Sequence, residues 1–540
     1  MQEDCTYLSY KDTNYFSSIA LDYLQQSSQL QPFYQHPVSI DGIRLSIANR
    51  QQFNTNRTLL VDELRKQYNG LPLSKKQEDN LQLLLQPNTY TITTAHQPNI
   101  FTGPLFFIYK IIHAIKLADE LNKQLTEYKF VPVYYMGSED ADLDELGYIN
   151  LAGEKYSWQT KQTGAVGRMK VDKSFLQLID SIEGRIGTYP FGEELIATFK
   201  QCYTEGKSIQ QATLELVNAL FASYGLLVLI PDNASFKKAF SSVIEKELTE
   251  QFSHKAVKET ITELGKHYEV QAGGRDINMF YLKDDKRERI TIQNSKFKIQ
   301  NLGIEFTKEE ILNEFNNHPE RFSPNVILRG VLQETILPNI AFIGGGGELA
   351  YWLELKKVFE EAHVPYPMLL LRNSFLLMGE NKLKQWNKLG FTVTDLFKDI
   401  NTLIDQYVRK NTENDISLEG EKEDLQRLYD MVISKVAYID VTLSEHVLAL
   451  EHKHLNKLNE LEKKILRAEK RKFEEQQKQI NCIKKELFPD NNLQERVQNM
   501  SLYYALYGKD WLDKIYNASK GLEPEFGIIQ MHCIKQHQNC

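Results

Sequence analysis

YTITTAHQPNIFTGPLFFIYKIIHAIKLADEL (residues 90–121) decides the fold of this chain. Residues 90–95 are mostly β-branched or aromatic, which predicts a strand. The segment HQPNIFTGP (96–104) cannot continue that strand. The apolar residues after it recur at helical spacing, so we expect a helix over residues 105–121 with Pro104 at its first position. KFVPVYYM (129–136) is then apolar on both faces, which is typical of a buried strand in a parallel sheet.

A polar turn follows the first of these strands and contains His96, Gln97, Asn99 and Gly103. In open α/β sheets, ligands bind at the carboxyl ends of the strands. We therefore predict that His96 contacts a ligand or shuttles a proton, because the ordinary pKa of histidine lies near neutrality. The N–H groups that open the following helix could hold a phosphate or a carboxylate. The alternative is a turn residue bonded only to nearby backbone.

The second strand runs directly into GSEDADLDELG (137–147), where five carboxylates lie close together: Glu139, Asp140, Asp142, Asp144 and Glu145. Like charges at this spacing repel each other unless a cation or an ammonium group is present. We predict that Glu139 and Asp140 bind Mg²⁺ with a nucleotide, or accept a proton from an attacking amine. The alternative is a solvated loop whose later carboxylates only cap a helix.

A run of four glycines, Gly344, Gly345, Gly346 and Gly347, precedes Glu348 between a predicted strand and a predicted helix. Glycine is needed where backbone approaches a ligand closely or adopts positive φ. The run matches neither a Walker A loop nor a complete G-x-G-x-x-G motif. It therefore predicts a strand–helix crossing at a pocket more strongly than it predicts a nucleotide site.

Arginines are the candidates for holding an anionic substrate. RFSPNVILRG (321–330) combines a Ser-Pro-Asn turn, which includes Asn325, with Arg329, and Arg372 ends the last predicted core strand. Either Arg329 or Arg372 could bind a carboxylate with two parallel hydrogen bonds. A structural ion pair is the equal alternative for each.

The composition narrows the class of protein. The chain has 540 residues, is 42% hydrophobic and carries a net charge of −8, which argues against nonspecific binding to nucleic acid. No apolar run reaches the roughly 18 residues that a membrane span needs. The first ten residues are acidic and polar and do not predict a signal peptide. Five scattered cysteines do not predict a disulfide framework, so we expect a cytoplasmic protein.

The pattern along the chain predicts three parts. Residues 1–388 form a Rossmann-type parallel α/β core with a mainly helical insertion near 156–221 and a β-hairpin-containing insertion near 265–325. Apolar residues spaced three or four apart predict a long helical hairpin over 389–488, or a helix that pairs with another subunit. Residues 489–540 are expected to fold back onto the core.

The end of the chain carries four residues that could bind a metal: His532, Cys533, His537 and Cys540. Both residue types ligate zinc, but their spacing is not that of a standard zinc finger. A frayed tail is favoured over a zinc site.

Five motifs in order resemble one known family. They are HQPNIFTGPLFFIYKIIHAIKLA, VPVYYMGSEDADLDEL, INMFYLKDDKRERI, ERFSPNVILRGVLQETILPNIAFIGGGGELAYWLELKKVFE and LQERVQNM. Together they are similar to the bacillithiol biosynthesis cysteine-adding enzymes, the cysteine ligases BshC. The resemblance implies a Rossmann core related to the nucleotidyl-transferase fold of class I aminoacyl-tRNA synthetases, a long antiparallel coiled-coil hairpin and a homodimer. Gly330 departs from the family pattern, where proline is expected, and this would loosen the turn that carries Arg329.

The activity that the resemblance implies is attachment of cysteine to glucosaminyl-malate, which forms the amide of bacillithiol. Amide formation in water requires an activated acid, and ATP with Mg²⁺ is the expected activator. His96 and the helix opening would hold the activated group, Glu139 or Asp140 would take the amine proton or hold Mg²⁺, and an arginine would hold the malate carboxylate. The alternatives are a nucleotidyl transferase with another acceptor and a non-catalytic, nucleotide-binding dimeric scaffold.

Overall fold

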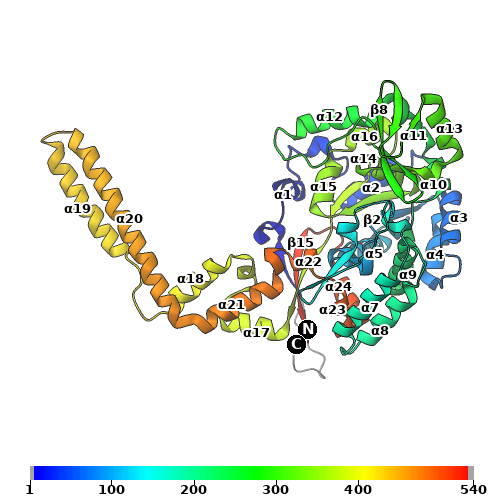
Figure 1. Cartoon of the computed structure of the whole chain (residues 1–540). Helices are drawn as coiled ribbons and strands as arrows, with labels where there is room; N and C mark the ends of the chain where they lie inside the picture. Colours follow the sequence, from blue (N-terminus) through cyan, green and yellow to red (C-terminus); the bar gives the residue numbers. More distant parts are fainter. Residues whose placement is uncertain (1–4, 533–540) are drawn as a thin grey trace. The chain divides into compact units, whose positions relative to one another are not determined.

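The computed structural model describes residues 5–532, which form two compact units (Figure 1). Unit 1 comprises residues 5–377 and 492–529, and unit 2 comprises residues 378–491 and 530–532. None of the helices within residues 5–532 is long and apolar enough to cross a membrane.

Unit 1 is built on a five-stranded parallel sheet. Its strands, in spatial order, are β13 (Met368–Leu371), β12 (Asn339–Gly344), β2 (Thr89–His96), β3 (Lys129–Met136) and β6 (Leu227–Leu229). Numbered along the chain, this order reads 5-4-1-2-3, which is the Rossmann order. The predicted α/β class is confirmed. The order reverses between β2 and β12, where such sheets bind ligands.

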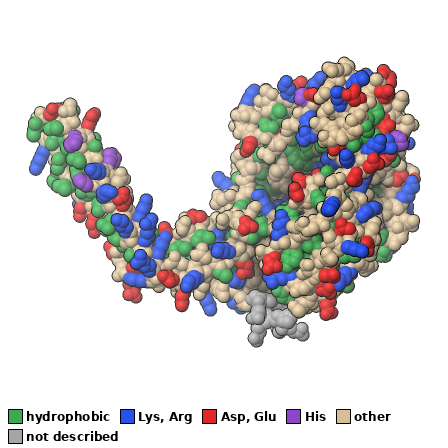
Figure 2. Space-filling view, viewed as in Figure 1, with side chains coloured by type: hydrophobic (Ala, Val, Ile, Leu, Met, Phe, Trp, Pro, Cys, Tyr) green, Lys and Arg blue, Asp and Glu red, His purple; other side chains and the backbone are tan. Residues whose placement is uncertain are grey.

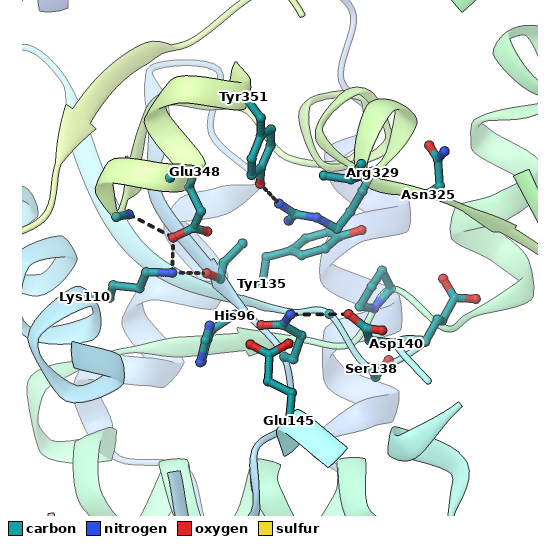
Figure 3. A pocket seen from close by; sticks show the side chains of 18 of the residues that line it. His96, Lys110, Tyr135, Ser138, Asp140, Glu145, Asn325, Arg329, Glu348 and Tyr351 are labelled. Atoms are coloured by element: carbon teal, nitrogen blue, oxygen red, sulfur yellow. Dashed lines mark hydrogen bonds and ion pairs between the residues drawn. The ribbon is translucent and has the colours of Figure 1, made fainter. Parts of the chain in front are cut away.

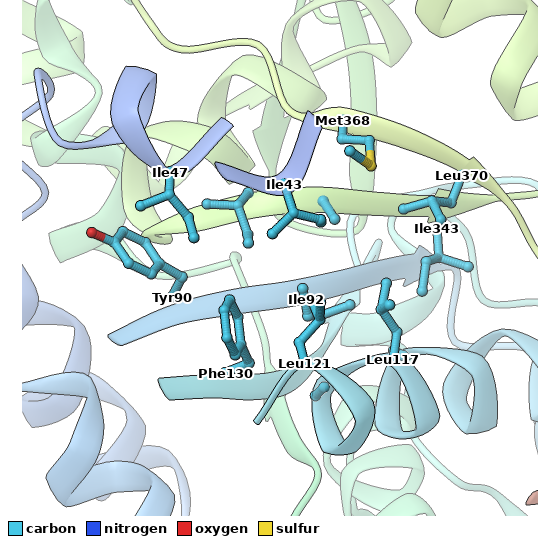
Figure 4. Packing of buried hydrophobic residues seen from close by; sticks show 14 of the residues in the cluster. Ile43, Ile47, Tyr90, Ile92, Leu117, Leu121, Phe130, Ile343, Met368 and Leu370 are labelled. Carbon is cyan, nitrogen blue, oxygen red and sulfur yellow. The ribbon is translucent and has the colours of Figure 1, made fainter. Parts of the chain in front are cut away.

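The hydrophobic core lies on both faces of this sheet (Figure 4). Ile43 and Ile47 of helix α2 (Ile40–Arg50) cover one face, and Leu117 and Leu121 of helix α5 (Phe106–Gln124) cover the other. Ile92 of β2 lies between them and is fully buried. Burial of each such side chain stabilises the fold by roughly 1.5–3 kcal/mol. The loops that leave the strands are therefore attached to a rigid sheet.

Helix α5 begins later than the sequence predicted. Pro104 lies before the helix, in an isolated β-bridge with Asn499, and is not its first residue. The N–H of Leu105 donates to the Gln498 carbonyl at 2.8 Å, and the N–H of Phe107 donates to the Pro104 carbonyl at 3.0 Å. These two groups are therefore already satisfied and are not free to hold an anion.

The other described strands form three further sheets. The insertion near 265–325 forms an antiparallel sheet in the order β10 (Ile304–Phe306), β9 (Lys296–Ile299), β8 (Lys286–Gln293), β7 (Met279–Lys283) and β11 (Phe322–Pro324). A second sheet pairs β1 (Cys5–Ser9), β15 (Glu525–Met531) and β14 (Ser374–Gly379), and a third pairs β4 (Tyr148–Leu151) with β5 (Glu154–Ser157). Strand β1 has no local signal in the sequence, because it pairs with β15, a strand about 520 residues away.

The remaining helices of unit 1 surround these sheets. They are α1 (Ser18–Leu24), α3 (Arg57–Gln67), α4 (Lys75–Leu84), α6 (Leu143–Leu146), α7 (Lys173–Ile186), α8 (Gly192–Cys202), α9 (Ile209–Phe221), α10 (Ala234–Ala239), α11 (Ser241–Glu250), α12 (Phe252–Leu264), α13 (Lys308–Asn317), α14 (Val326–Ile336), α15 (Gly346–Leu353), α16 (Lys356–Ala362), α22 (Gln494–Val497), α23 (Ser501–Tyr507) and α24 (Lys509–Ala518).

Unit 2 is helical, with α17 (Glu380–Lys388), α18 (Ile400–Asn411), α19 (Glu419–Ala437), α20 (Thr442–Lys470) and α21 (Glu474–Leu487). Helices α19 and α20 pack as the predicted hairpin. The apolar spacing of three or four residues that predicted this hairpin continues through residues 438–441, where the chain turns between α19 and α20. Hydrophobic side chains lie at the surface of this hairpin (Figure 2), and no residue of α19 is buried.

Candidate active site

A pocket of about 520 Å³ lies at the carboxyl edge of the parallel sheet in unit 1 (Figure 3). The ends of three neighbouring strands supply much of its lining. His96 ends β2, Glu139 and Asp140 follow β3, and Gly345–Gly347 follow β12. The pocket therefore occupies the place where the strand order reverses, as the fold requires for a ligand site.

Most of the predicted site residues line this pocket: His96, Gln97, Glu139, Asp140, Asn325, Arg329, Gly345, Gly346, Gly347, Glu348 and Arg372. Asn99, Gly103 and Gly344 do not line it. Gly103 adopts φ of 63°, and a Cβ there would lie 2.7 Å from the Asn99 side chain, so these two residues shape the turn itself. Gly344 accepts the N–H of Arg372 at 2.8 Å as part of the sheet edge.

His96 lies against the rings of Phe106 and Phe107, at centroid distances of 5.2 and 5.4 Å. Burial holds the pKa of His96 well below its ordinary value, and the positive charges of Lys110, Arg372 and Arg329 act in the same direction. His96 is therefore neutral at pH 7, which suits the predicted ligand contact better than the predicted proton shuttle. Its Nε2 is buried and has no hydrogen-bond partner among the described residues.

The buried Lys110 and the partly exposed Glu348 form an ion pair beside His96 (Figure 3). The Lys110 ammonium also donates to the Ala95 carbonyl at 3.0 Å. Burial lowers the pKa of Lys110, and the Glu348 carboxylate opposes that shift. Glu348 accepts the N–H of Gly345 at 2.8 Å, so it caps helix α15 from within. The glycine run thus begins helix α15, and the anion at the N-terminus of this helix is the Glu348 carboxylate of the same chain.

The carboxylate turn after β3 separates into two kinds of residue. Glu139 accepts a hydrogen bond from the fully buried Lys237 at 2.7 Å. Burial raises the pKa of Glu139, and Lys237 opposes the rise. Asp140 makes no ion pair with any residue between 5 and 532, and it accepts the Gln97 amide at 3.3 Å and the Ala141 N–H at 2.7 Å. Asp140 therefore has a charge that remains available to a ligand, as does Glu145, the other carboxylate of this turn that lines the pocket without an ion pair among the described residues.

The two predicted arginines also differ in whether a carboxylate of the protein compensates their charge. Arg372 pairs with the fully buried Glu495 at 2.7 Å, so its charge is already compensated. Arg329 donates to the Tyr351 hydroxyl at 2.6 Å and lies 5.8 Å from the Tyr135 ring centroid, and it has no carboxylate partner among the described residues. Arg329 is thus the stronger of the two candidates for binding a substrate anion.

Comparison with known proteins shows the family of this chain. A family model described as "Bacillithiol biosynthesis BshC, N-terminal Rossmann-like domain" matches residues 3–373, and the corresponding C-terminal coiled-coil domain matches residues 375–531. The chain belongs to the bacillithiol biosynthesis BshC family. It is 40% identical to a Flavobacterium johnsoniae protein and 39% identical to a Flavobacterium psychrophilum protein, both named "Putative cysteine ligase BshC". Each alignment covers 98% of this chain and 100% of the relative.

A solved Campylobacter jejuni structure described as a "putative arginyl t-RNA synthetase" covers 76% of this chain and 93% of its own length. Its sequence identity is 12% and its TM-score is 0.21, values that support no argument about this BshC chain. The relationship to nucleotidyl transferases stays a prediction.

Gly330, where this chain departs from the expected BshC pattern, lies inside helix α14 and not in a turn. A Cβ at this position would lie 2.9 Å from the Trp352 ring. Trp352 is itself stacked between Phe342 and Phe359 and cannot move freely. The glycine therefore fits a packing requirement, and the expected loosening of the Arg329 segment was wrong.

Several residues that line the pocket were not predicted: Phe106, Lys110, Tyr135, Ser138, Glu145, Arg287, Tyr351 and Arg496. Lys110 had a signal, because it is a lone charge in the apolar helix segment FFIYKIIHAI. Arg287 had none, since it lies on strand β8 of the inserted sheet, almost 150 residues from the carboxylate turn.

Within residues 5–532, no group of three or more histidine, cysteine, aspartate or glutamate side chains could hold a metal ion. Mg²⁺ bound with a nucleotide takes ligands from phosphate and water as well, so the pocket carboxylates still fit that form of binding. His532 lies 3.4 Å from Glu380, while Cys533, His537 and Cys540 lie outside the described residues.

Proposed function

We propose that this protein joins the carboxyl group of cysteine to the amine of glucosaminyl-malate, with ATP as the activator, and so forms bacillithiol. The family, the names of its relatives and the pocket support the proposal. One observation carries it for this chain. Three buried polar atoms that face no partner, His96 Nε2, Ser138 Oγ and Arg287 Nε, belong to residues that line a single pocket. A buried polar atom without a partner needs an explanation, and for three such atoms on the lining of one pocket a bound ligand supplies it.

The reaction needs two steps because a carboxylate does not acylate an amine in water. In the first, a cysteine carboxylate oxygen attacks ATP, and either pyrophosphate or ADP leaves. In the second, the sugar amine attacks the activated carbonyl, AMP or phosphate leaves, and the amine loses a proton. The protein contributes positioning and charge stabilisation.

The two ends of the pocket suit these two steps. Lys110, Arg329 and Arg372 each lower the pKa of His96, and of these three cations only Arg329 has no carboxylate partner within residues 5–532. The Arg329 end of the pocket therefore fits the phosphate of the activated cysteine. Asp140 lies on the carboxylate turn with its charge unpaired, and it is the residue we assign as acceptor of the amine proton.

Purified protein incubated with ATP, cysteine and glucosaminyl-malate should produce bacillithiol, detected by mass spectrometry. Release of AMP or of ADP identifies the activated intermediate. Failure to form bacillithiol where a BshC relative forms it would reject the proposal. Conversion of ATP without transfer to glucosaminyl-malate would favour a nucleotidyl transferase with another acceptor.

We also propose that the protein is a homodimer, with the α19–α20 hairpin as the contact. Three apolar residues of this hairpin, Leu428, Met431 and Ile439, are 51%, 59% and 79% exposed. Exposed apolar side chains clustered on one hairpin are typical of an interaction surface. Light scattering should give twice the chain mass of 62.7 kDa, and Met431→Glu with Ile439→Glu should reduce it to the single mass. A monomeric wild-type protein would reject this part.

A further inference from the structure

Arg287 stands out among the charged residues of unit 1. It lies on β8, in the sheet inserted between β6 and β12, and it lines the pocket. Its guanidinium lies 3.7 Å from the ring centroid of Phe280 on the adjacent strand β7, which restricts its orientation. Its Nε is buried without a hydrogen-bond partner, and it forms no ion pair within the described part of the chain.

Two other cations that line the pocket are compensated by the protein, since Lys110 pairs with Glu348 and Arg372 with Glu495. Arg329 lacks a carboxylate partner like Arg287, but it donates to the Tyr351 hydroxyl, whereas Arg287 Nε has no hydrogen-bond partner among the described residues. A partly buried guanidinium without such a carboxylate loses hydration and gains no ion pair in return. An anionic group of a ligand would supply the missing partner, because guanidinium binds carboxylate or phosphate with parallel hydrogen bonds.

The surroundings of Arg287 favour a carboxylate over a phosphate. Burial lowers the pKa of Arg287, and the carboxylates of Asp140 and Glu139 oppose that shift, so both carboxylates lie within electrostatic range. A doubly charged phosphate at Arg287 would be repelled by these two residues. A single carboxylate that belongs to the same molecule as an amine would place a negative charge on Arg287 and a positive charge near Asp140.

The chemistry of ligation identifies which substrate this is. Both substrates carry an amine and carboxylate, but the carboxylate of cysteine is consumed when it is activated. The malyl carboxylates of the acceptor remain unchanged throughout the reaction, so an arginine can hold one of them during both steps. The acceptor also carries the amine that must reach the activated carbonyl.

We propose that Arg287 binds one malyl carboxylate of the acceptor and thereby directs the acceptor amine toward Asp140. The inference rests on the proposed function and adds a residue that selects the acceptor. The inserted β7–β8 hairpin supplies this residue, while helix α14 supplies Arg329, which is assigned to the activated phosphate. An acceptor that lacks the malyl group should therefore lose the benefit of Arg287.

The test compares glucosaminyl-malate with methyl glucosaminide, which has the amine but no carboxylate. Isothermal titration calorimetry measures the binding of each acceptor alone, without any reaction. We expect Arg287→Gln to weaken glucosaminyl-malate binding about 10- to 100-fold, as loss of a charged hydrogen-bonded contact does. Binding of methyl glucosaminide and the KM for ATP should change less than about threefold, and Arg287→Lys should restore part of the lost affinity. Arg289→Gln is the matched control, because Arg289 lies two residues along the same strand, is exposed and does not line the pocket.

Equal weakening for both acceptors, a raised KM for ATP, or no weakening by Arg287→Gln would each overturn the assignment of Arg287. Wild-type protein that binds no glucosaminyl-malate would overturn it together with the proposed function. Wild-type protein that binds glucosaminyl-malate through Arg287 but makes no bacillithiol would support the assignment of Arg287 and reject the ligase activity.

Discussion

Replacing Lys237 by methionine removes the partner of Glu139 from the pocket wall. Lys237 is fully buried, and its ammonium donates to Glu139 at 2.7 Å and to the Phe322 carbonyl at 2.6 Å. The substitution leaves a buried carboxylate and a backbone carbonyl without a donor. Removing one member of a buried ion pair costs about 3–5 kcal/mol of unfolding free energy. Lys237→Met with Glu139→Gln should cost less than Lys237→Met alone, because no uncompensated charge remains.

The loss of unfolding free energy should depend on pH, and the direction of this dependence follows from the pKa of Glu139. Burial already raises the pKa of Glu139 and Lys237 opposes the rise, so removing Lys237 raises this pKa further. A carboxyl whose pKa is higher in the folded state than in the unfolded state, where it is about 4.3, stabilises the fold at low pH. That stability is lost as the pH rises through the folded-state pKa. The deficit of Lys237→Met relative to the wild type should therefore be larger at pH 8 than at pH 5.

Urea denaturation followed by tryptophan fluorescence at the two pH values measures this difference. Lys238→Met is the matched control, since Lys238 neighbours Lys237 in helix α10 but is exposed. The reasoning is refuted if Lys237→Met is as stable as the control, or if its deficit is the same at both pH values.

Three further predictions concern single residues. Asp140→Asn should lower kcat about 100-fold or more without changing the melting temperature. The control Asp144→Asn should leave kcat unchanged, because Asp144 is exposed and does not line the pocket. Equal effects of the two substitutions would reject Asp140 as the proton acceptor. Gly330→Ala should destabilise the protein by about 1–3 kcal/mol, because the added Cβ meets the Trp352 ring, and unchanged thermal stability would contradict this packing. The NMR signals of His96 should not titrate between about pH 6 and 8, since burial holds its pKa well below its ordinary value; a midpoint near 6.5 would show that the site is more open.

Local sequence patterns predicted the elements of the parallel sheet well. The apolar run at residues 129–136 coincides with β3, and the β-hairpin predicted within the insertion near 265–325 forms between β7 and β8. These patterns are local, because the residues that alternate or repeat lie on the same element. Strand β1 and the turn at residues 438–441 were missed for the opposite reason. The first depends on a distant partner strand, and the second interrupts an apolar spacing that continues across it. The domain borders predicted at 388 and 488 stay predictions.

The candidate site could be predicted mainly where it depends on strand ends. His96, Asp140 and Gly345 were found because each follows a strand of one parallel sheet, whose carboxyl ends share an edge. Their electrostatic states could not be predicted. The neutral state of His96 and the pairing of Glu139 depend on burial and on side chains from other elements.

The pairing of charges separates two kinds of residue at the pocket and behind its wall, in a chain whose net charge is −8. Lys237, Arg372 and Lys110 have carboxylate partners within the protein, so their removal should first reduce stability. Asp140 and Arg287 have no ion-pair partner within residues 5–532, so their removal breaks no ion pair and should first reduce ligand binding or turnover. An anionic acceptor can therefore enter a negatively charged protein, because the attraction comes from a few uncompensated groups at short range and not from the total charge.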